Sequence, residues 1–332
     1  MAQHTPSRGS TRGSPVLLAL DWGTSSLRAF LLSDAGDVLN ARHTQRGILH
    51  LPAPAQAGGF EQAFAEIARD WLTQWPALQV VAAGMVGSAQ GWKEAPYARC
   101  PVDARALAAH GVRVASGLGP EVLIAPGVLF DAGDHSPDVM RGEEIQIAGA
   151  LAAQPEWAER ACVVLPGTHS KWVRIEDGRI QSFATYMTGE LYAVLRNHSI
   201  LGRLMPADAD AEPSAAEAAF GLGLRAARDS RPGDLTRQLF ATRTLGLTRS
   251  LPNETLADHL SGLLIGHELV SGLAASRAML EAGAPLLLIG DAALCRRYAH
   301  ALETLGAPAR AQLDNTAPRG LWEFARAAGL LD

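Results

Sequence analysis

A pattern that occurs twice places the strongest constraint on the fold of this chain. In each copy an apolar run ends in a turn with the residues Gly-Thr-x-Ser, a second apolar run follows, and an Asp/Gly turn closes the unit. Gly23-Thr24 and Gly167-Thr168 are 144 residues apart. A repeated supersecondary unit indicates repeated structure. The sequence therefore predicts two similar domains that meet near residues 150–160.

Length and composition agree with two globular domains. The chain has 332 residues, of which 48% are apolar and 19% are charged, and domains commonly contain about 100–200 residues. We expect a disordered tail over residues 1–14, a first domain over 15–153 and a second domain over 154–332.

Charge, hydropathy and cysteine content exclude several classes of protein. The net charge of −5 argues against a nucleic-acid partner that is bound by a basic face. The apolar runs are too short for a membrane span or a secretory signal, and three scattered cysteines indicate neither a disulfide framework nor a zinc site. We expect a cytoplasmic protein with small-molecule partners, and the sequence leaves a homodimer open.

The elements can be placed from their apolar patterns. Continuous apolar runs predict strands, which we place over residues 16–20, 27–32, 38–39, 78–85, 122–125, 161–165, 172–175, 179–183 and 286–289. Helical spacing of apolar residues predicts helices over 60–72, 138–153, 214–228, 235–245, 256–282 and 292–305. Ser136 or Asp138 would cap the helix over 138–153.

The two Gly-Thr turns suit the binding of phosphate groups. A carboxylate at a strand end, here Asp21, can hold a hydrated Mg²⁺ ion, and the following N–H and hydroxyl groups can donate to phosphate oxygens. A plain Gly-rich β-turn is the alternative for either copy alone. The candidate phosphate ligands are Gly23, Thr24, Ser25 and Ser26 in the first copy and Gly167, Thr168, His169, Ser170 and Lys171 in the second.

A general base is expected at the start of the helix over 138–153. Asp138, Glu143 and Glu144 are the candidates, because a carboxylate can accept the proton of a hydroxyl as a phosphoryl group arrives. The alternative is that these carboxylates only stabilise the helix N-terminus.

The loop over residues 84–97 mixes small, amide, aromatic and basic residues in a way that suits a polyol acid. A solvent loop with a packed Trp is the alternative. The candidate substrate ligands are Ser88, Gln90, Trp92, Lys93 and Tyr97, together with Arg28. Residues 188–191 are either a helix cap or a further ligand contact. Gly290, between a buried strand and a helix, is typical of nucleotide-binding turns.

Several strings resemble the 2-dehydro-3-deoxygalactonokinase family of the sugar kinase, Hsp70 and actin superfamily. The most specific are Arg141-Gly142-Glu143-Glu144 and Pro166-Gly167-Thr168-His169-Ser170-Lys171-Trp172-Val173. Others lie at residues 20–28, 84–97, 188–191, 260–268 and 288–291, in the family's order. Asp291 departs from the family, which more often has a small residue there.

The resemblance implies an α/β fold with two ribonuclease-H-like domains that flank a nucleotide cleft. It implies ATP-dependent phosphorylation of 2-dehydro-3-deoxy-D-galactonate at its 6-hydroxyl, with Mg²⁺, in D-galactonate catabolism. The first domain would bind the sugar acid and the second would bind ATP through its phosphate turn and Gly290. The resemblance also implies Glu143 as the first choice of base and Asp138 as the second.

Two alternatives remain open at this point. One is a kinase of another sugar or sugar acid, such as 2-dehydro-3-deoxy-D-gluconate. The other is an actin- or Hsp70-like ATPase without a sugar substrate, although that class has no evident use for a polyol-binding loop over residues 84–97.

Overall fold

The chain forms two compact units in the computed structural model, which describes residues 13–133, 136–206 and 211–331. Unit 1 contains the described residues up to Glu156 together with those from Thr316 onward, and unit 2 is Trp157–Asn315. Most of the predicted tail, residues 1–12, lies outside the described part. The predicted second domain differs from unit 2, because the segment from Thr316 packs with unit 1.

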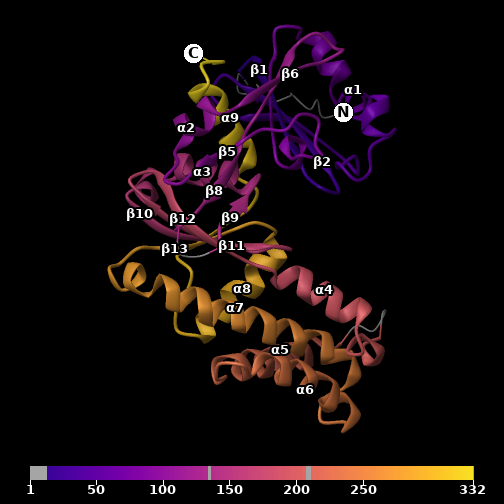
Figure 1. The fold of residues 1–332 in the computed structure, drawn as a ribbon, viewed down its shortest axis with the longest axis vertical. Coiled ribbons are helices and arrows are strands. Elements are labelled where there is room, and N and C mark those ends of the chain that lie inside the picture. Colours follow the sequence, from indigo (N-terminus) through magenta and orange to yellow (C-terminus); the bar gives the residue numbers. More distant parts are fainter. Residues whose placement is uncertain (1–12, 134–135, 207–210, 332) are drawn as a thin grey trace, which may run out of the picture. The chain divides into compact units, whose positions relative to one another are not determined.

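Unit 1 is built on a six-stranded sheet with the order β3-β2-β1-β4-β7-β6 (Figure 1). Its strands are β1 (Pro15–Trp22), β2 (Leu27–Ser33), β3 (Val38–Thr44), β4 (Gln79–Ala83), β6 (Val112–Ala115) and β7 (Glu121–Ile124). The strands β1, β2 and β3 form the predicted antiparallel meander. The strand β4 lies parallel to β1 and β7.

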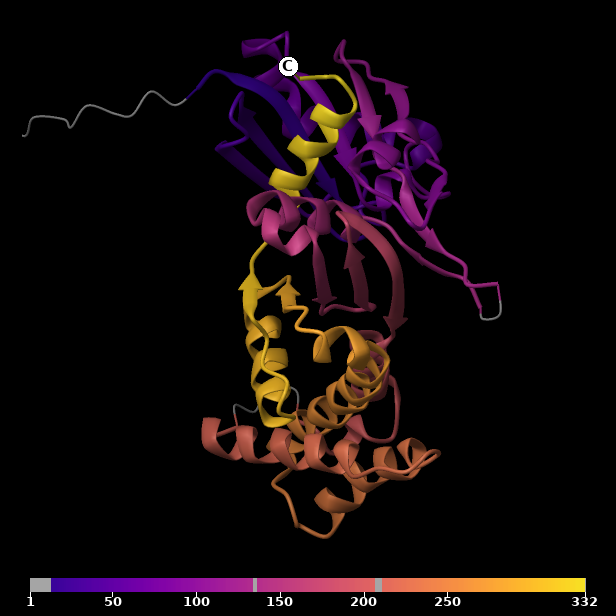
Figure 2. The ribbon, with the colours of Figure 1, turned by 90° about the vertical axis from the view of Figure 1, so that its left-hand side faces the viewer.

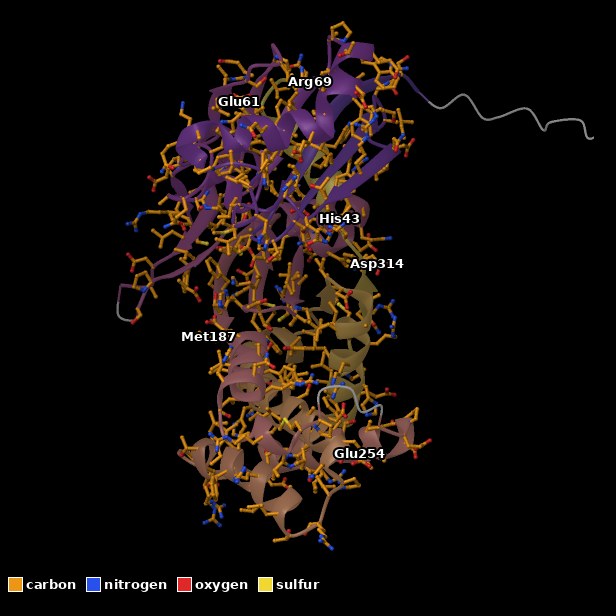
Figure 3. All side chains as sticks on the ribbon, turned by 90° about the vertical axis from the view of Figure 1, so that its right-hand side faces the viewer. His43, Glu61, Arg69, Met187, Glu254 and Asp314 are labelled. Carbon is orange, nitrogen blue, oxygen red and sulfur yellow. The ribbon has the colours of Figure 1, made fainter. Side chains whose placement is uncertain are left out.

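Helices cover this sheet. They are α1 (Gly59–Gln74), α2 (Ala104–Ala109), α3 (Glu143–Ala153) and α9 (Ala317–Ala327). One face of α1 packs Phe60, Phe64 and Ile67 into the core, and Arg69 on its outer face is exposed (Figure 3). The helix α9, the last one along the chain, packs on α3 and against the sheet of unit 1 (Figure 2).

A small second sheet in unit 1 corrects one prediction. It has the order β5 (Tyr97–Arg99), β8 (Gly127–Phe130) and β9 (Asp138–Met140). Asp138 therefore lies on a strand, paired with Phe130, and the predicted helix over 138–153 begins only at Glu143. Gly142, with a φ of +109°, separates the two elements, since such a φ favours glycine and is not helical.

The sheet of unit 2 repeats the arrangement of β3, β2, β1, β4 and β7 in the large sheet of unit 1. Its sheet has the order β12-β11-β10-β13-β14. The strands are β10 (Arg160–Leu165), β11 (Ser170–Glu176), β12 (Arg179–Tyr186), β13 (Leu286–Ile289) and β14 (Ala311–Leu313). Again an antiparallel meander is followed by parallel strands. Two such ribonuclease-H-like units confirm the predicted α/β fold class of the sugar kinase, Hsp70 and actin type.

The helices of unit 2 are α4 (Thr188–His198), α5 (Pro213–Arg228), α6 (Leu235–Leu247), α7 (Leu256–Glu281) and α8 (Ala292–Thr304). All except α4 were predicted. Gly223 and Gly262 let α5 and α7 pack with their backbones in close approach, since a Cβ atom at Gly262 would lie 2.0 Å from the carbonyl oxygen of Phe220. In the described part of the chain, no helix is both long and apolar enough to cross a membrane.

Candidate active site

The candidate site of unit 1 lies where β1 and β4 end side by side. Asp21 pairs with Ala83 across these parallel strands, and Gly84 follows with a φ of +94°. A Cβ atom at Gly84 would lie 2.8 Å from the carbonyl oxygen of Trp22, and one at Gly142 would lie 3.4 Å from the Gly84 Cα atom. The two glycines thus let the start of α3 approach the end of β1.

Asp21 is the acidic group at this edge. Its side chain is 17% exposed and forms an ion pair with Arg28, which lies opposite it on β2. Burial raises the pKa of Asp21, Arg28 opposes that rise, and the nearby charge of Glu143 adds to it. The predicted base Glu143 therefore lies close enough to the predicted metal ligand Asp21 for its charge to be felt there.

Glu143 and Glu144 open α3 but occupy different environments. Glu143 is partly exposed, and its Oε2 atom accepts a hydrogen bond from the Arg141 N–H group at 3.1 Å. Glu144 is 0% exposed, and its Oε2 atom accepts from the Gly142 N–H group at 2.7 Å. Burial, followed by the charge of Glu143, raises the pKa of Glu144 to about 8. Of the two, only the Glu143 side chain is partly open to solvent, whereas Glu144 is closed off inside unit 1.

The first phosphate turn is held from outside by the segment after β3. The turn closes with a hydrogen bond from the Gly23 N–H group to the Ser26 carbonyl oxygen at 2.9 Å. The N–H groups of Ile48 and Leu49 donate to the carbonyl oxygens of Gly23 and Thr24, each at 3.1 Å. These carbonyl groups are therefore occupied, and the hydroxyl groups of Thr24, Ser25 and Ser26 are left for a ligand.

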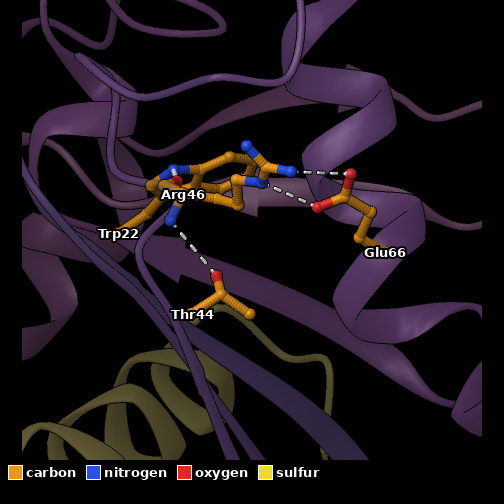
Figure 4. A network of polar contacts seen from close by, with 4 residues as sticks. All are labelled: Trp22, Thr44, Arg46 and Glu66. Atoms are coloured by element: carbon orange, nitrogen blue, oxygen red, sulfur yellow. Dashed lines mark hydrogen bonds and ion pairs between the residues drawn. The ribbon is translucent and has the colours of Figure 1, made fainter.

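Arg46 anchors that segment to the core (Figure 4). Its carbonyl oxygen accepts from the Trp22 Nε1–H group at 2.8 Å, and its guanidinium group forms an ion pair with Glu66 at 2.8 Å (Figure 4). Trp22 is fully buried directly after Asp21. The network therefore fixes the strand end that carries the predicted metal ligand.

The predicted substrate loop over residues 84–97 divides into core and surface. Trp92 packs against Trp22, Phe60 and Phe64 at the edge of the core and stays partly exposed. Ser88 is buried, and its hydroxyl group makes no hydrogen bond to the described protein. Gln90 is exposed. The Lys93 ammonium group donates to the Arg113 carbonyl oxygen at 2.7 Å.

Arg141 contacts this loop, although no role was predicted for it from the sequence. Its guanidinium group lies 4.6 Å from the centre of the Tyr97 ring and donates to the Ala95 carbonyl oxygen at 2.9 Å. Its Nε and Nη1 atoms are buried without a hydrogen-bond partner in the described protein. The string Arg-Gly-Glu-Glu was the available signal, but only its acidic residues were assigned a role.

The second phosphate turn, in unit 2, is held by the start of α4. The Glu190 N–H group donates to the Thr168 carbonyl oxygen at 3.0 Å, and the Glu190 side chain forms an ion pair with His169. A Cβ atom at Gly189 would lie 2.5 Å from the Gly167 carbonyl oxygen. Glycine is therefore required where α4 meets the turn.

The two polar residues that close this turn are buried. Ser170 is 0% exposed, and its hydroxyl group accepts from the Gly167 N–H group at 3.3 Å and contacts the Tyr298 hydroxyl group at 3.1 Å. Lys171 is 4% exposed, and its ammonium group donates to the His169 carbonyl oxygen at 3.0 Å. Both side chains shape the turn from within, so its outer surface consists of Gly167, Thr168 and His169.

Gly290 lies beside the second turn because β10 and β13 are parallel neighbours. A Cβ atom at Gly290 would lie 3.5 Å from the Pro166 carbonyl oxygen. Asp291 caps α8, since its side chain accepts from the N–H groups of Ala293 and Leu294 at 3.0 and 2.9 Å. Asp291, which departs from the family pattern, therefore stabilises the start of α8.

The donor set of unit 1 fits a magnesium ion that keeps most of its water. Mg²⁺ is commonly held by one or two carboxylates together with substrate phosphates, and Asp21 with Glu143 provides such carboxylates. A cage formed only by protein side chains is not present, since no group of three or more His, Cys, Asp or Glu side chains in the described residues could hold an ion.

Comparison with known proteins identifies the family. The chain matches the family model of 2-keto-3-deoxy-galactonokinase over residues 21–324. It is 35% identical to the 2-dehydro-3-deoxygalactonokinase of Escherichia coli (strain K12) over 301 residues, which are 90% of this chain and 94% of that protein. A crystal structure of a 2-dehydro-3-deoxygalactonokinase protein from Sinorhizobium meliloti superposes with a TM-score of 0.78 at 34% identity, and covers 94% of this chain and 98% of its own.

These matches agree with two ribonuclease-H-like units that each present a phosphate-type turn at a strand end. The resemblance drawn from the sequence is confirmed, and so is the predicted enzyme class, a phosphotransferase with an alcohol group as acceptor. The chain belongs to the 2-dehydro-3-deoxygalactonokinase family.

Proposed function

We propose that this chain transfers the terminal phosphoryl group of ATP to the 6-hydroxyl group of 2-dehydro-3-deoxy-D-galactonate, in D-galactonate catabolism. The observation that carries the proposal is the approach of Glu143 to Asp21 at the strand edge of unit 1, in a chain that belongs to this family. A carboxylate pair at a phosphate turn supplies both a proton acceptor and a metal ligand.

Glu143 acts as the general base in this proposal. It takes the proton of the 6-hydroxyl group while the oxygen forms a bond to the γ-phosphorus, and the bond from that phosphorus to the bridging oxygen of ADP breaks. Glu144 is unsuited to the role, because it is fully buried and its pKa is about 8. Asp138 lies on β9 rather than at the start of α3, which leaves it second.

Unit 2 holds the nucleotide in this proposal. The N–H and hydroxyl groups of Thr168 suit the phosphate oxygens, and Gly290 allows the nucleotide to approach the backbone beside them. Mg²⁺, when bound near Asp21, neutralises part of the charge on the phosphate groups.

Unit 1 holds the sugar acid in this proposal. Gln90 and Ser88 suit its hydroxyl groups, and Arg28, Lys93 and Tyr97 are the candidates around its acid group. Trp92 holds the loop against the core with one side of its ring, and the partly exposed remainder is available to the sugar acid. The cytoplasmic location and the homodimer stay predictions from the sequence.

Replacing the base tests the proposed mechanism. Glu143→Gln should lower turnover by about 10³-fold, the scale of general-base catalysis, while ATP binding measured by calorimetry stays near that of the native enzyme. Glu156→Gln serves as the control, because Glu156 is exposed and lies just after α3. A Glu143→Gln enzyme that keeps most of its turnover would remove Glu143 from the role.

Substrate dependence tests the reaction itself. ADP release in a coupled assay should depend strongly on 2-dehydro-3-deoxy-D-galactonate and should be weaker with its D-gluconate epimer. Equal rates with both epimers would favour a broader sugar-acid kinase. Slow ADP release that no sugar acid changes would favour an ATPase of the actin or Hsp70 type.

A further inference from the structure

A buried carboxylate in unit 2 has no part in the proposed chemistry. Glu268 lies on α7 and is 2% exposed. Its Oε1 atom accepts from the Trp172 Nε1–H group at 3.0 Å, and its Oε2 atom accepts from the Tyr298 hydroxyl group at 2.6 Å. Burying a carboxylate costs free energy unless it is well hydrogen-bonded. The hydrogen bonds to Glu268 are therefore needed to keep its side chain inside unit 2.

The partners of Glu268 come from three other elements of unit 2. Burial raises the pKa of Glu268, and hydrogen bonds from Thr188, Tyr298, Trp172 and Ser170 oppose the rise. These residues belong to the start of α4, to α8 and to β11. Figure 1 shows α4, α7 and α8 together below the sheet of unit 2. One carboxylate therefore connects the elements that surround the second phosphate turn.

Two of these connections lead directly to the turn. Ser170 accepts from the Gly167 N–H group and contacts Tyr298, so a change at Glu268 reaches Gly167 through Ser170. Thr188 precedes Gly189 and Glu190, which contact the turn at Gly167 and Thr168. A third connection runs along α8 from Tyr298 to the Gly290 loop.

We propose that Glu268 is a positioning residue for the nucleotide, which holds the Gly167–Lys171 turn and the start of α8 in the geometry that binds ATP. It does not touch the nucleotide, and it acts through Ser170, Thr188 and Tyr298. The inference rests on the proposed function, in which this turn binds the phosphates of ATP.

The chemistry of an amide predicts how Glu268→Gln acts. The carboxylate accepts from two donors, whereas glutamine offers one acceptor oxygen and one NH₂ group. Trp172 is a donor only, so the amide oxygen must face it, and the NH₂ group then faces Tyr298. The Tyr298 hydroxyl group must turn its proton toward Ser170, which disturbs the contact that closes the turn.

The experiment compares nucleotide and acceptor binding in matched variants of the full-length enzyme. Glu268→Gln should raise the Kd for ADP, measured by calorimetry, by about 10-fold, a change of about 1.4 kcal/mol, while the KM for the sugar acid changes less than about twofold. Tyr298→Phe should act in the same direction but more weakly. Glu281→Gln, at the exposed end of the same helix, should change neither constant.

A double variant sharpens the test. Glu268→Gln and Tyr298→Phe share a hydrogen bond, so their combined effect on ADP affinity should be smaller than the sum of the two. A loss of thermal stability with unchanged ADP affinity would overturn the proposal, as would equal losses for ADP and sugar acid. If Glu268→Gln fails to fold, the ADP affinity and the sugar-acid KM of Tyr298→Phe decide the proposal by the same criteria. If the native enzyme binds no ADP, the proposed function itself fails.

Discussion

The two phosphate turns share a backbone plan but differ in the side chains that complete them. In unit 1 the strands are joined across the charged pair of Asp21 and Arg28, whereas in unit 2 the corresponding strand end pairs Leu165 with Lys171. The first turn closes through a backbone carbonyl group and the second through the hydroxyl group of Ser170. The two turns therefore share a backbone shape and differ at the strand end, which carries an acidic residue in unit 1 and an apolar one in unit 2.

The segments that hold the two turns in place also differ between the units. The first turn is covered by a surface segment at residues 47–49 and so keeps its hydroxyl groups available. The second turn rests on a buried network that involves α4, α7 and α8. This difference favours a division of labour in which unit 1 carries reactive groups and unit 2 holds a ligand rigidly.

The largest expected effect comes from removing the charge that distinguishes the first turn. Asp21→Asn should lower turnover by about 10³-fold, the scale of a lost electrostatic group at a reaction centre, and should raise the Mg²⁺ concentration required. ADP affinity should stay nearly unchanged, because the nucleotide turn lies in unit 2. Steady-state kinetics across Mg²⁺ concentrations and ADP calorimetry measure these effects.

Asp37→Asn is the matched control for that variant, since Asp37 is exposed at the next turn of the same meander. If Asp21→Asn left the Mg²⁺ dependence of turnover unchanged, Asp21 would not be a metal ligand. Its difference from Leu165 in unit 2 would then have no role in the reaction.

The buried titratable groups of the two units predict opposite pH dependences of stability. Burial lowers the pKa of His259 in unit 2 from 6.5 to about 4, so the unfolded chain binds a proton first as the pH falls. The stability from neutral His259 is complete above pH 6.5 and is lost as the pH falls toward 4, by about 3 kcal/mol. The cost of His259→Asn, measured by urea unfolding, should therefore shrink over that range.

Glu144 in unit 1 has the opposite sign. Its pKa is raised from 4.5 to about 8, so the folded unit binds the proton first, and this contribution is present below pH 4.5 and is lost as the pH rises through 8. Glu144→Gln should gain stability relative to the native chain over that range. Gln62→Asn, at an exposed position whose side chain does not titrate, should show no such trend. Slopes of equal sign for the two variants would contradict the contrast.

The smallest effect concerns two glycines that let neighbouring segments reach the turns. A Cβ atom at Gly47 would lie 2.3 Å from the Thr24 carbonyl oxygen, and one at Gly189 would lie 2.5 Å from that of Gly167. Each alanine variant should cost about 1–3 kcal/mol of stability through overpacking. Gly189→Ala should raise the KM for ATP, whereas Gly47→Ala should mainly lower kcat.

Gly221→Ala provides the control for these two variants, because a Cβ atom there meets only the flexible end of Arg225 within 4 Å. If both turn variants changed kcat and KM in equal proportion, the proposed division of labour between the turns would be wrong.

The sequence predicted best the elements with a continuous or helically spaced apolar pattern. Strands such as β1 and β10 are continuous apolar runs, and α5 to α8 have apolar residues at helical spacing, so local pattern and final structure agree. The helix α4 exposes Leu191 and Val194 and has no clear apolar stripe to predict it. The error at Asp138 came from reading a helical pattern through Gly142, where the backbone leaves the helical region.

The site was predictable where a motif is local and not where it depends on tertiary contacts. Asp21 and Glu143 could be named from their strings, but their approach depends on the close contact of Gly84 with Gly142. Trp92 was assigned to the ligand, because a sequence cannot show that its ring packs on Phe60. Glu268 had a signal, an acidic residue in an apolar helix, but its partners come from elements far apart in the chain.

The return of α9 to unit 1 has a consequence for the order in which the protein can form during synthesis. Unit 2 is one continuous stretch, complete once Asn315 has been made, whereas unit 1 needs Leu321 and Phe324 of α9, both buried in it. Domains generally fold as units as the chain emerges. Unit 1, although most of it is translated first, therefore depends for its final packing on a helix that is translated after the whole of unit 2.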